Sequence, residues 1–338
     1  QNILRGIDLL KRMTGRMILT EALPIAESMV LQIKKMSEVG QVDFVGSLRR
    51  MKETVGDIDI VATSDSPEKV IEKFTNLTAV QQVLTKGQTK STIIHQNGQQ
   101  VDLEIVPENE YGSLLQHFTG SKEHNVALRT YAQENNMSIS EHGIKIAGKQ
   151  KKFSNEKDFY GFLKMVWIPP ELRENTGEIE AALKNKLPKL VEISDIRGDL
   201  HVHSDWSDSN LSIEEIAEGA EKLGYEYIVI SDHTVGLGIA GGLDEKDLEK
   251  RQKEIEQVQE KHPKIKILSS VEVNIKANGD LDIQDWMLEK LDVVTASIHT
   301  SFYQGLERTT ERLIKAINHP HVDIIGHPSG RIIGQREP

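Results

Sequence analysis

Beyond residue 199, short apolar segments alternate with segments of helical spacing, and this alternation narrows the possible folds more than any other feature of the sequence. The clearest apolar segments are Tyr227–Ile230, Ile265–Leu268, Val293–Val294 and Val322–Ile325. The clearest helical segment runs from Asp244 to Gln259. Parallel strands need such crossovers, because the chain must return to the same end of the sheet before the next strand begins. We therefore predict a parallel α/β barrel in this half.

A histidine or a carboxylate stands at or after the end of each predicted strand. The candidate ligands are His201, His203, Asp208, His233, Glu272, His299 and His327. In a parallel barrel the carboxyl ends of the strands meet at one face, so these side chains are expected to converge there. An isolated His-x-His is more often part of a polar loop, but recurrence at strand after strand favours a metal site. The chain has no cysteine, so the ligands must be imidazoles and carboxylates, which suit Mn²⁺ or Zn²⁺.

This arrangement resembles the PHP (polymerase and histidinol phosphatase) domain, from about Asp199 to the end of the chain. The resemblance implies a distorted (β/α)7 barrel in which nine ligands hold up to three divalent cations and a bridging hydroxide attacks phosphorus. The seven candidate residues match seven of the nine ligands. The other two would form an Asp-x-His motif beyond Pro338, so we expect a C-terminally truncated domain that binds fewer ions and loses hydrolytic activity.

Three aspartates mark the first half of the chain. Asp57 and Asp59 stand two apart on a predicted strand, so both carboxylates project from one face, where a divalent cation would relieve their repulsion. Asp102, between apolar neighbours on another predicted strand, would supply a third carboxylate on that face. An isolated Asp-x-Asp is more often a solvated strand face, so the metal interpretation depends on its neighbours. Upstream, the Gly46-Ser47 turn offers N–H groups and a hydroxyl to phosphate oxygens.

The turn, the Asp-x-Asp strand and the later aspartate together resemble the palm of family X DNA polymerases, such as DNA polymerase beta. The resemblance extends from about Ile3 to Lys145, and it includes the segment from His117 to Ser121. It implies that the three aspartates are catalytic and hold two Mg²⁺ ions. Implied nucleotide contacts are Gly46, Ser47, Arg50, Gly56, His117, Phe118, Gly120 and Asn125. Implied DNA contacts are Thr119 and Arg129.

Three residues depart from the animal repair enzymes of that family. His117 replaces a tyrosine, Glu104 stands where those enzymes carry an arginine, and Val126 replaces a lysine near the template base. Sugar discrimination and the switch between open and closed forms are therefore left open by the resemblance.

The predicted organisation has four consecutive regions, with an α/β and α+β fold in two domains. Residues 1–40 are helical and correspond to the end of a fingers region, and 41–165 form a nucleotidyltransferase palm and thumb with a mixed sheet. Residues 166–195 are predicted to be a linker, because Pro169-Pro170 begins a charged stretch with few bulky apolar residues. Residues 196–338 form the PHP domain. The family's lyase domain and helix-hairpin-helix are largely absent, so we expect weak DNA affinity.

The charge distribution is uneven along the chain. Residues 1–165 carry 21 Lys+Arg and 20 Asp+Glu, whereas residues 166–338 carry 20 and 32, within a net charge of -11. The first half is therefore the better candidate for contact with nucleic acid. No run of 18 apolar residues and no export signal are present, so we expect no membrane partner and, by the family resemblance, the bacterial cytoplasm. A monomer is the default expectation.

The leading hypothesis is a two-activity enzyme of base excision repair whose substrates are dNTPs and gapped or primed DNA. The first domain would fill short gaps, and the second would act as a Mn²⁺-dependent 3'-5' exonuclease and abasic-site endonuclease. One alternative keeps the polymerase and treats the barrel as structural or regulatory. Others are a small-molecule nucleotidyltransferase joined to a phosphatase, which the segment from Phe118 to Arg129 disfavours, and a non-catalytic DNA-binding fragment.

Overall fold

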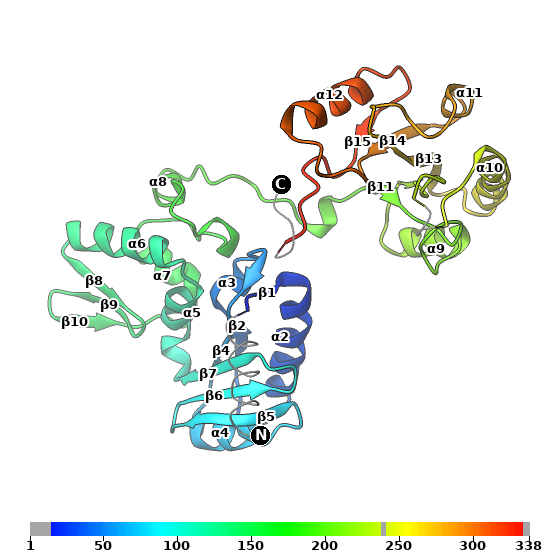
Figure 1. Cartoon of the computed structure of the whole chain (residues 1–338). Helices are drawn as coiled ribbons and strands as arrows, with labels where there is room; N and C mark the ends of the chain where they lie inside the picture. Colours follow the sequence, from blue (N-terminus) through cyan, green and yellow to red (C-terminus); the bar gives the residue numbers. More distant parts are fainter. Residues whose placement is uncertain (1–14, 238–240, 334–338) are drawn as a thin grey trace. The chain divides into compact units, whose positions relative to one another are not determined.

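The computed structural model describes residues 15–237 and 241–333 (Figure 1). The chain divides into two compact units, residues 1–189 and 190–338, each of which is described by itself. Residues 1–14 of the region 1–40 that is predicted to be helical lie outside the described residues. In the described part of the chain, no helix is both long enough and apolar enough to cross a membrane.

A five-stranded sheet forms the palm of the first unit, in the order β2-β4-β7-β6-β5. Its strands are β2 (Val42–Phe44), β4 (Ile58–Thr63), β5 (Val80–Lys86), β6 (Lys90–His95) and β7 (Gln100–Val106). Strands β4 and β7 are parallel and the other pairs are antiparallel, so the predicted mixed sheet is confirmed. Strands β6 and β7 form a hairpin through Asn97-Gly98, where Gly98 adopts a φ of 88° that favours glycine.

Alternation of side chains along β4 and β7 gives the two faces of this sheet different roles. Ile58 and Ile60 face a large apolar core with α2 (Leu19–Lys34) and α4 (Pro67–Thr75). On the other face, Val61 and Val106 pack against α5 (Tyr111–Thr119). Because α5 packs on these far ends of the strands, the face near the start of β4 is left for polar side chains. A short helix, α3 (Gly46–Arg49), follows β2, and β1 (Met17–Ile18) pairs with β3 (Thr54–Val55).

The thumb completes the first unit and packs around its own apolar core. Its elements are α6 (Lys122–Glu134), β8 (Met137–Ser140), β9 (Gly143–Ile146), β10 (Lys149–Lys151), α7 (Glu156–Phe162) and α8 (Glu178–Leu183). The prediction of a linker over 166–195 needs correction, since Ile168 and Ile179 lie in the thumb core and the unit extends to Lys189. Few apolar residues suffice there because Arg173, with no exposed surface, forms an ion pair with Glu156. Spacing along the sequence does not reveal such a contact.

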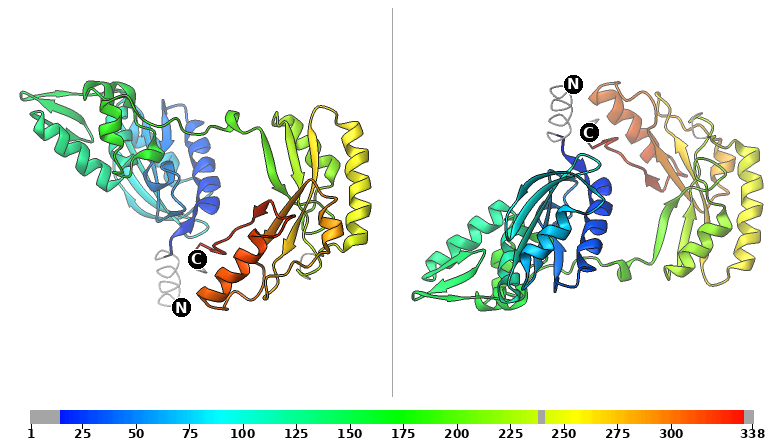
Figure 2. Two further views of the ribbon diagram at one scale, coloured as in Figure 1. Left: turned by 90° about the horizontal axis from the view of Figure 1, so that it is seen from above. Right: turned by 90° about the horizontal axis from the view of Figure 1, so that it is seen from below.

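The second unit contains a curled, fully parallel sheet whose five described strands follow their order in the sequence (Figure 2). The strands are β11 (Gly198–Val202), β12 (Tyr227–Ile230), β13 (Lys266–Asn274), β14 (Val293–Ser297) and β15 (Ile324–Ile325). The connecting helices are α9 (Ile213–Lys222), α10 (Glu245–Lys261), α11 (Asp285–Leu288) and α12 (Leu306–Ile317). This confirms the predicted parallel α/β arrangement, of which the described residues form a half-barrel of five strands.

The helices of the second unit begin where the sequence offers capping groups. Asp244 accepts hydrogen bonds from the first backbone N–H groups of α10, and Ser212 forms a capping box with Glu215 at α9. Helices α9 and α10 then pack an apolar face on β12 and β13, while α10 and α12 contribute to a second core with β14. With the helices on this face, the carboxyl ends of the strands carry the polar residues.

Candidate functional sites

The three aspartates of the first unit lie together on the open face of the palm sheet. Asp59 and Asp102 are register partners on parallel strands β4 and β7, and Asp57 immediately precedes β4. Each contributes a carboxylate oxygen to a group within 4.8 Å. Gln100 donates a hydrogen bond of 2.7 Å to Asp102 Oδ2, and the Thr92 hydroxyl donates to Oδ1, so this carboxylate is fixed in place.

The carboxylates of this triad repel one another. Burial, followed by the charges of Asp57 and Asp102, raises the pKa of Asp59 to about 7. Lys90 acts in the opposite direction but does not restore the ordinary value. A divalent cation would replace this repulsion by attraction, and carboxylate oxygens alone suit a hard ion such as Mg²⁺. The donor set of the triad therefore fits the predicted ions.

Gly46 lies directly beside the triad. Its φ of 67° favours glycine, and a Cβ at this position would lie only 3.0 Å from Asp59 Oδ2. The backbone of α3 therefore approaches the carboxylate as closely as a residue without a side chain permits. Gly56 holds a different position, where its carbonyl accepts a hydrogen bond from the Gln99 side chain. Ser47 follows Gly46 in α3 and is half-buried.

Arg50, predicted to hold a triphosphate, is engaged with the thumb in this structure. Its Nε donates to Glu174 Oε1 at 2.8 Å, and its Nη1 donates to the Thr119 carbonyl. Lys52 Nζ lies 3.6 Å from the same Glu174 oxygen. Gly120 allows the close approach, since a Cβ there would lie 3.0 Å from Arg50 Nη1. A phosphate group would have to compete with Glu174 for this arginine.

The other predicted nucleotide and DNA contacts form a connected group at the start of the thumb. Asn125 donates 2.7 Å to the His117 carbonyl, and Arg129 Nη2 lies 3.2 Å from His117 Nδ1. Burial and the neighbouring Arg129 lower the pKa of His117, so its neutral form is favoured. Phe118 carries Lys90 Nζ 5.6 Å from its ring centre. This group therefore links the thumb to the palm strand that lies beside Asp102.

A buried ionic cluster that sequence reasoning missed joins the palm to the thumb. Arg49 donates to both oxygens of Glu156, at 3.0 and 2.9 Å, and Arg173 donates to Oε1 at 2.6 Å. Trp167 Nε1 donates to the same carboxylate at 3.0 Å. Although burial opposes ionisation, the two arginines hold the pKa of Glu156 at about 2. The four residues are spread over more than 120 positions of the sequence, so no local pattern predicts that they meet. Only the adjacent pair Arg49-Arg50 hints at an ionic contact.

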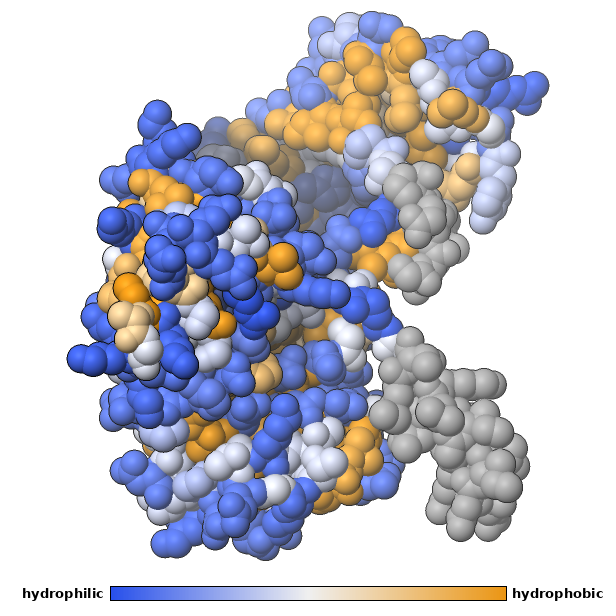
Figure 3. All heavy atoms as spheres, turned by 90° about the vertical axis from the view of Figure 1, so that its left-hand side faces the viewer, coloured by the Kyte–Doolittle hydropathy of each residue, from blue (hydrophilic) through white to orange (hydrophobic). Residues whose placement is uncertain are grey.

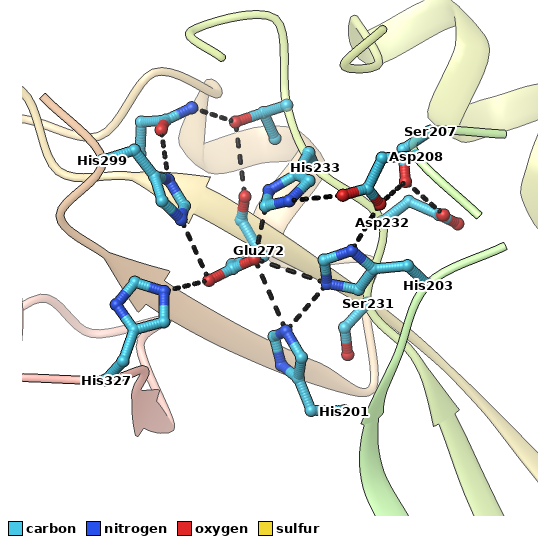
Figure 4. Close-up of polar contacts among 12 residues, drawn as sticks. His201, His203, Ser207, Asp208, Ser231, Asp232, His233, Glu272, His299 and His327 are labelled. Carbon is cyan, nitrogen blue, oxygen red and sulfur yellow. Dashed lines mark hydrogen bonds and ion pairs between the residues drawn. The ribbon is translucent and has the colours of Figure 1, made fainter. Parts of the chain in front are cut away.

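In the second unit, Glu272 stands at the centre of the predicted ligands (Figure 4). Its Oε2 lies 3.5, 3.4 and 3.1 Å from nitrogens of His201, His203 and His233. Its Oε1 lies 3.2 Å from His299 Nε2 and 3.0 Å from His327 Nε2. We call these five histidines, Glu272 and Asp208 the histidine cluster. Glu272 lies within β13 rather than after a strand, so the predicted position at a strand end is corrected for this residue.

The electrostatics of the histidine cluster are the reverse of those of the triad. Although burial opposes ionisation of Glu272, hydrogen bonds from the surrounding imidazoles hold its pKa well below the usual range. The hydrogen bond to Glu272 and then Asp208 raise the pKa of His203 to about 9. Asp208 Oδ1 accepts from His203 Nδ1 at 2.7 Å, and Oδ2 lies 3.4 Å from His233 Nε2. All seven predicted ligands are thus brought to one place.

The donor set of the histidine cluster fits divalent metal ions. His201 Nε2 and His203 Nε2 lie 2.9 Å apart, so two nitrogens point at each other as well as at Glu272. Three overlapping groups of three ligands each have donor atoms within 4.8 Å, and His203, His233 and Glu272 each belong to two of them. Shared ligands of this kind suit adjacent cations bridged by a carboxylate.

Residues behind the cluster orient it, and sequence reasoning missed most of them. Asn274 Oδ1 accepts from His299 Nδ1 at 2.6 Å, which turns Nε2 toward Glu272. Asp232, fully buried beside His233, accepts from the Ser204 backbone N–H at 2.7 Å and from Arg251 at 2.8 Å. Asp232 therefore fixes the segment after β11 that carries Asp208. The sequence offered only its position next to His233 as a signal.

Both units match known families over the regions just described. The family model for the DNA polymerase beta thumb matches residues 114–174, and that for the PHP domain matches residues 199–334. DNA polymerase/3'-5' exonuclease PolX of Bacillus subtilis is 37% identical to the chain over 340 residues, covering 99% of this chain. The chain belongs to the family X DNA polymerases that carry a PHP domain. The thumb match continues through residues that had been predicted as linker.

Other relatives of this family X chain match one region each. A probable phosphatase of a Thermoanaerobacter species is 37% identical over 139 residues, which are 40% of this chain and 54% of that protein. DNA polymerase lambda of Rattus norvegicus is 28% identical over 161 residues, which are 38% of this chain and 28% of that polymerase. The chain spans 59% of the length of the Bacillus subtilis relative.

Proposed function

We propose that the full-length protein catalyses two phosphoryl-transfer reactions on DNA, template-directed nucleotide addition in the first unit and phosphodiester hydrolysis in the second. The observation that carries this proposal is the presence of two separate groups of convergent ligands, one of carboxylates and one built mainly of imidazoles. Bound divalent cations would lower the pKa of an attacking hydroxyl or water and offset the charge that develops at phosphorus. The protein's own residues position the reactants around them.

In the first unit we assign the catalytic role to Asp57, Asp59 and Asp102. Asp57 and Asp59 would hold both Mg²⁺ ions, and Asp102, fixed by Gln100 and Thr92, would hold the ion beside the primer 3'-hydroxyl. No protein nucleophile is required, because the primer hydroxyl attacks the α-phosphate and pyrophosphate leaves.

The substrate contacts of the first unit follow from the neighbourhood of the triad. Gly46 and Ser47 would approach the triphosphate, since Gly46 already lies against Asp59. Arg50 would exchange Glu174 for phosphate oxygens, a bidentate interaction that arginine favours. Gly56, His117, Phe118, Gly120 and Asn125 are assigned to the nucleotide side. Thr119 and Arg129 are assigned to the DNA side.

In the second unit we assign the seven ligands of the histidine cluster to metal binding. His203 and His233 serve overlapping groups, and Glu272, which also belongs to two of these groups, would contribute to more than one ion. Asn274 holds the tautomer of His299, and Asp232 holds the segment that presents Asp208. Mn²⁺ or Zn²⁺ is the expected occupant, because most of the ligands are imidazoles. Up to three ions are proposed for the full-length protein.

The finer proposal is a repair enzyme of the bacterial cytoplasm that acts as a monomer on gapped or primed DNA and dNTPs. The first unit would fill short gaps in base excision repair, and the second would remove nucleotides from 3' ends and incise abasic sites. The support is the order of the two units in one chain and the likeness to a relative named for polymerase and 3'-5' exonuclease activity. The alternative, a structural PHP domain, is disfavoured by the convergence of all seven ligands.

The test is primer extension and 3'-end degradation by the full-length protein on a one-nucleotide-gapped duplex with Mg²⁺ or Mn²⁺. Asp102→Ala should abolish extension and leave degradation intact, whereas His203→Ala should do the reverse. Extension that survives Asp102→Ala would show that the triad assignment is wrong. Degradation that survives His203→Ala would remove the hydrolytic role from the histidine cluster.

A further inference from the structure

A cavity of about 510 Å³ opens beside the histidine cluster in the second unit. Its walls come from the segment that follows β14, from the start of α12 and from the segment that follows β15. Its lining includes Phe302, Tyr303 and His327. His327 belongs to both places, since its Nε2 lies 3.0 Å from Glu272 Oε1. The cavity therefore adjoins the cluster at His327.

The surface around this cavity is unusually apolar and aromatic for an acidic half of a chain. Tyr303 is 95% exposed and Leu306 is 85% exposed, and Phe302 lies between metal ligand His299 and Tyr303 in the sequence. Figure 3 shows apolar surface gathered on the α12 side of this unit. Exposed apolar area of this kind marks a binding surface more often than it serves the fold.

The segment that presents Tyr303 is held in place by a buried arginine. Arg312, only 2% exposed, donates 3.0 Å to the Thr300 carbonyl and 3.1 Å to Gln304 Oε1. Gln304 in turn donates 3.0 Å to the Ala277 carbonyl. The segment on either side of Tyr303 is thus held in place at the rim, so a ligand that stacks on Tyr303 need not order this part of the backbone.

Two further features point to a ligand. Ser301 has a φ of 56° and His327 a φ of 27°, and such conformations in residues other than glycine collect at functional sites. Both residues line this cavity. Among the described residues that line it, none is Asp or Glu, and Arg312 and His327 are the ionisable side chains with a cationic form. The lining therefore does not repel a phosphodiester.

We propose that this cavity receives the terminal nucleoside of a DNA 3' end whose last phosphodiester lies at the histidine cluster, with the base stacked on Tyr303 and Phe302. The proposal rests on the hydrolytic function proposed for the second unit. A base and sugar are attached next to the phosphate that is cleaved, so they must occupy the space directly beside the cluster. Stacking on aromatic rings accepts any base, as trimming of arbitrary ends requires.

The test compares two single-stranded oligonucleotides that share every phosphodiester and differ only at the 3' end. One ends in a normal nucleotide, and the other ends in a tetrahydrofuran residue that lacks the base. With Mn²⁺ and the full-length protein, we expect removal of the normal nucleotide to be about tenfold faster in kcat/KM. Tyr303→Ala should abolish this preference, and Tyr303→Phe should preserve it because the ring remains.

Binding supplies a readout that does not depend on turnover. An oligonucleotide with 2-aminopurine at its 3' end loses fluorescence when the base stacks, so the wild type and His203→Ala should quench it and Tyr303→Ala should not. The proposal is wrong if Tyr303→Ala leaves both the preference and the quenching unchanged, or if the wild type shows neither. Degradation that persists in His203→Ala would instead overturn the proposed function, independently of the quenching result.

Discussion

The aspartate triad of the first unit and the histidine cluster of the second differ in how their own charges balance. In the triad, burial and two neighbouring carboxylates raise the pKa of Asp59 to about 7. In the cluster, imidazoles around Glu272 hold its pKa far below the usual range, while the pKa of His203 rises to about 9. The carboxylates of the triad therefore repel one another, whereas in the cluster the charge of Glu272 is offset by the surrounding imidazoles.

The two groups therefore differ in what a bound cation replaces, which is carboxylate repulsion at the triad and an imidazole proton at the cluster. A cation at the triad relieves repulsion among the carboxylates, so its binding should also raise the folding stability of the first unit. A cation at the cluster must displace a proton from His203, whose imidazole already interacts with Glu272 and Asp208, so binding should release this proton and depend on pH.

The largest effect is expected when the central carboxylate of the histidine cluster is neutralised. Glu272→Gln keeps the shape of the side chain but removes the charge shared by five imidazoles, so Mn²⁺-dependent degradation should fall at least about 100-fold. Extension by the first unit should be unchanged. The measurement is the rate of each reaction on the same gapped duplex, with bound Mn²⁺ determined by mass spectrometry. A variant that retains both metal and degradation would contradict the central role of Glu272.

Much of this contrast was predictable from the sequence, and the reason lies in local patterns. Strand β12 matches the predicted Tyr227–Ile230, because an apolar run between turn signals identifies a buried parallel strand. Most ligands of the cluster were predictable because they follow such a strand, whereas Glu272 lies within β13. The Asp59–Asp102 pairing followed from two strands of alternating pattern, which the parallel register of β4 and β7 brings side by side.

Long-range ionic contacts were not predictable. Glu156 reads as an ordinary charged residue at the start of a helix, yet it is buried and binds Arg49 and Arg173. The same contacts explain why the predicted linker is folded, because a buried charge pair can order a segment that has few apolar residues. Glu174 likewise shows no local pattern that predicts its ion pair with Arg50. Pairing of this kind depends on the tertiary fold rather than on spacing along the chain.

The second prediction concerns stability of the first unit at pH 8 in a metal-chelating buffer. Asp59 is ionised there at a cost, since its folded pKa of about 7 exceeds the ordinary value of 3.8. The wild type should therefore lose stability as pH rises from about 4 through 7, and Asp59→Asn should gain about 2 kcal/mol over the wild type at pH 8. Hydrogen exchange of β4 and β7 amides measures the difference, with Asp65→Asn, an exposed change outside the triad, as the control. A less stable Asp59→Asn would show that repulsion among the three carboxylates does not govern the stability of this site.

The third prediction tests the opposite sign in the second unit. The pKa of His203 in the folded state is raised from 6.5 to about 9. Its contribution to folding stability is therefore fully present below pH 6.5 and is lost as pH rises through 9. Without metal, the segment around β11 should lose about 1 kcal/mol over this range, and His203→Gln should lack this loss. Hydrogen exchange corrected for intrinsic rates measures it, and a stability that instead rises with pH would contradict the contrast between the units.

The smallest effect is expected at the contact between Arg50 and Glu174. This contact tests whether the triphosphate must displace Glu174 to reach Arg50. The pair is partly exposed and is worth at most about 1 kcal/mol, so Glu174→Gln should lower the KM for dNTP about threefold without changing kcat. The reason is that phosphate oxygens no longer compete with a charged carboxylate for Arg50. Glu171→Gln, an exposed change three residues earlier, is the matched control. A KM that rises instead would mean that Glu174 positions Arg50 for phosphate rather than withholding it, and the triphosphate would then meet an arginine already arranged for binding.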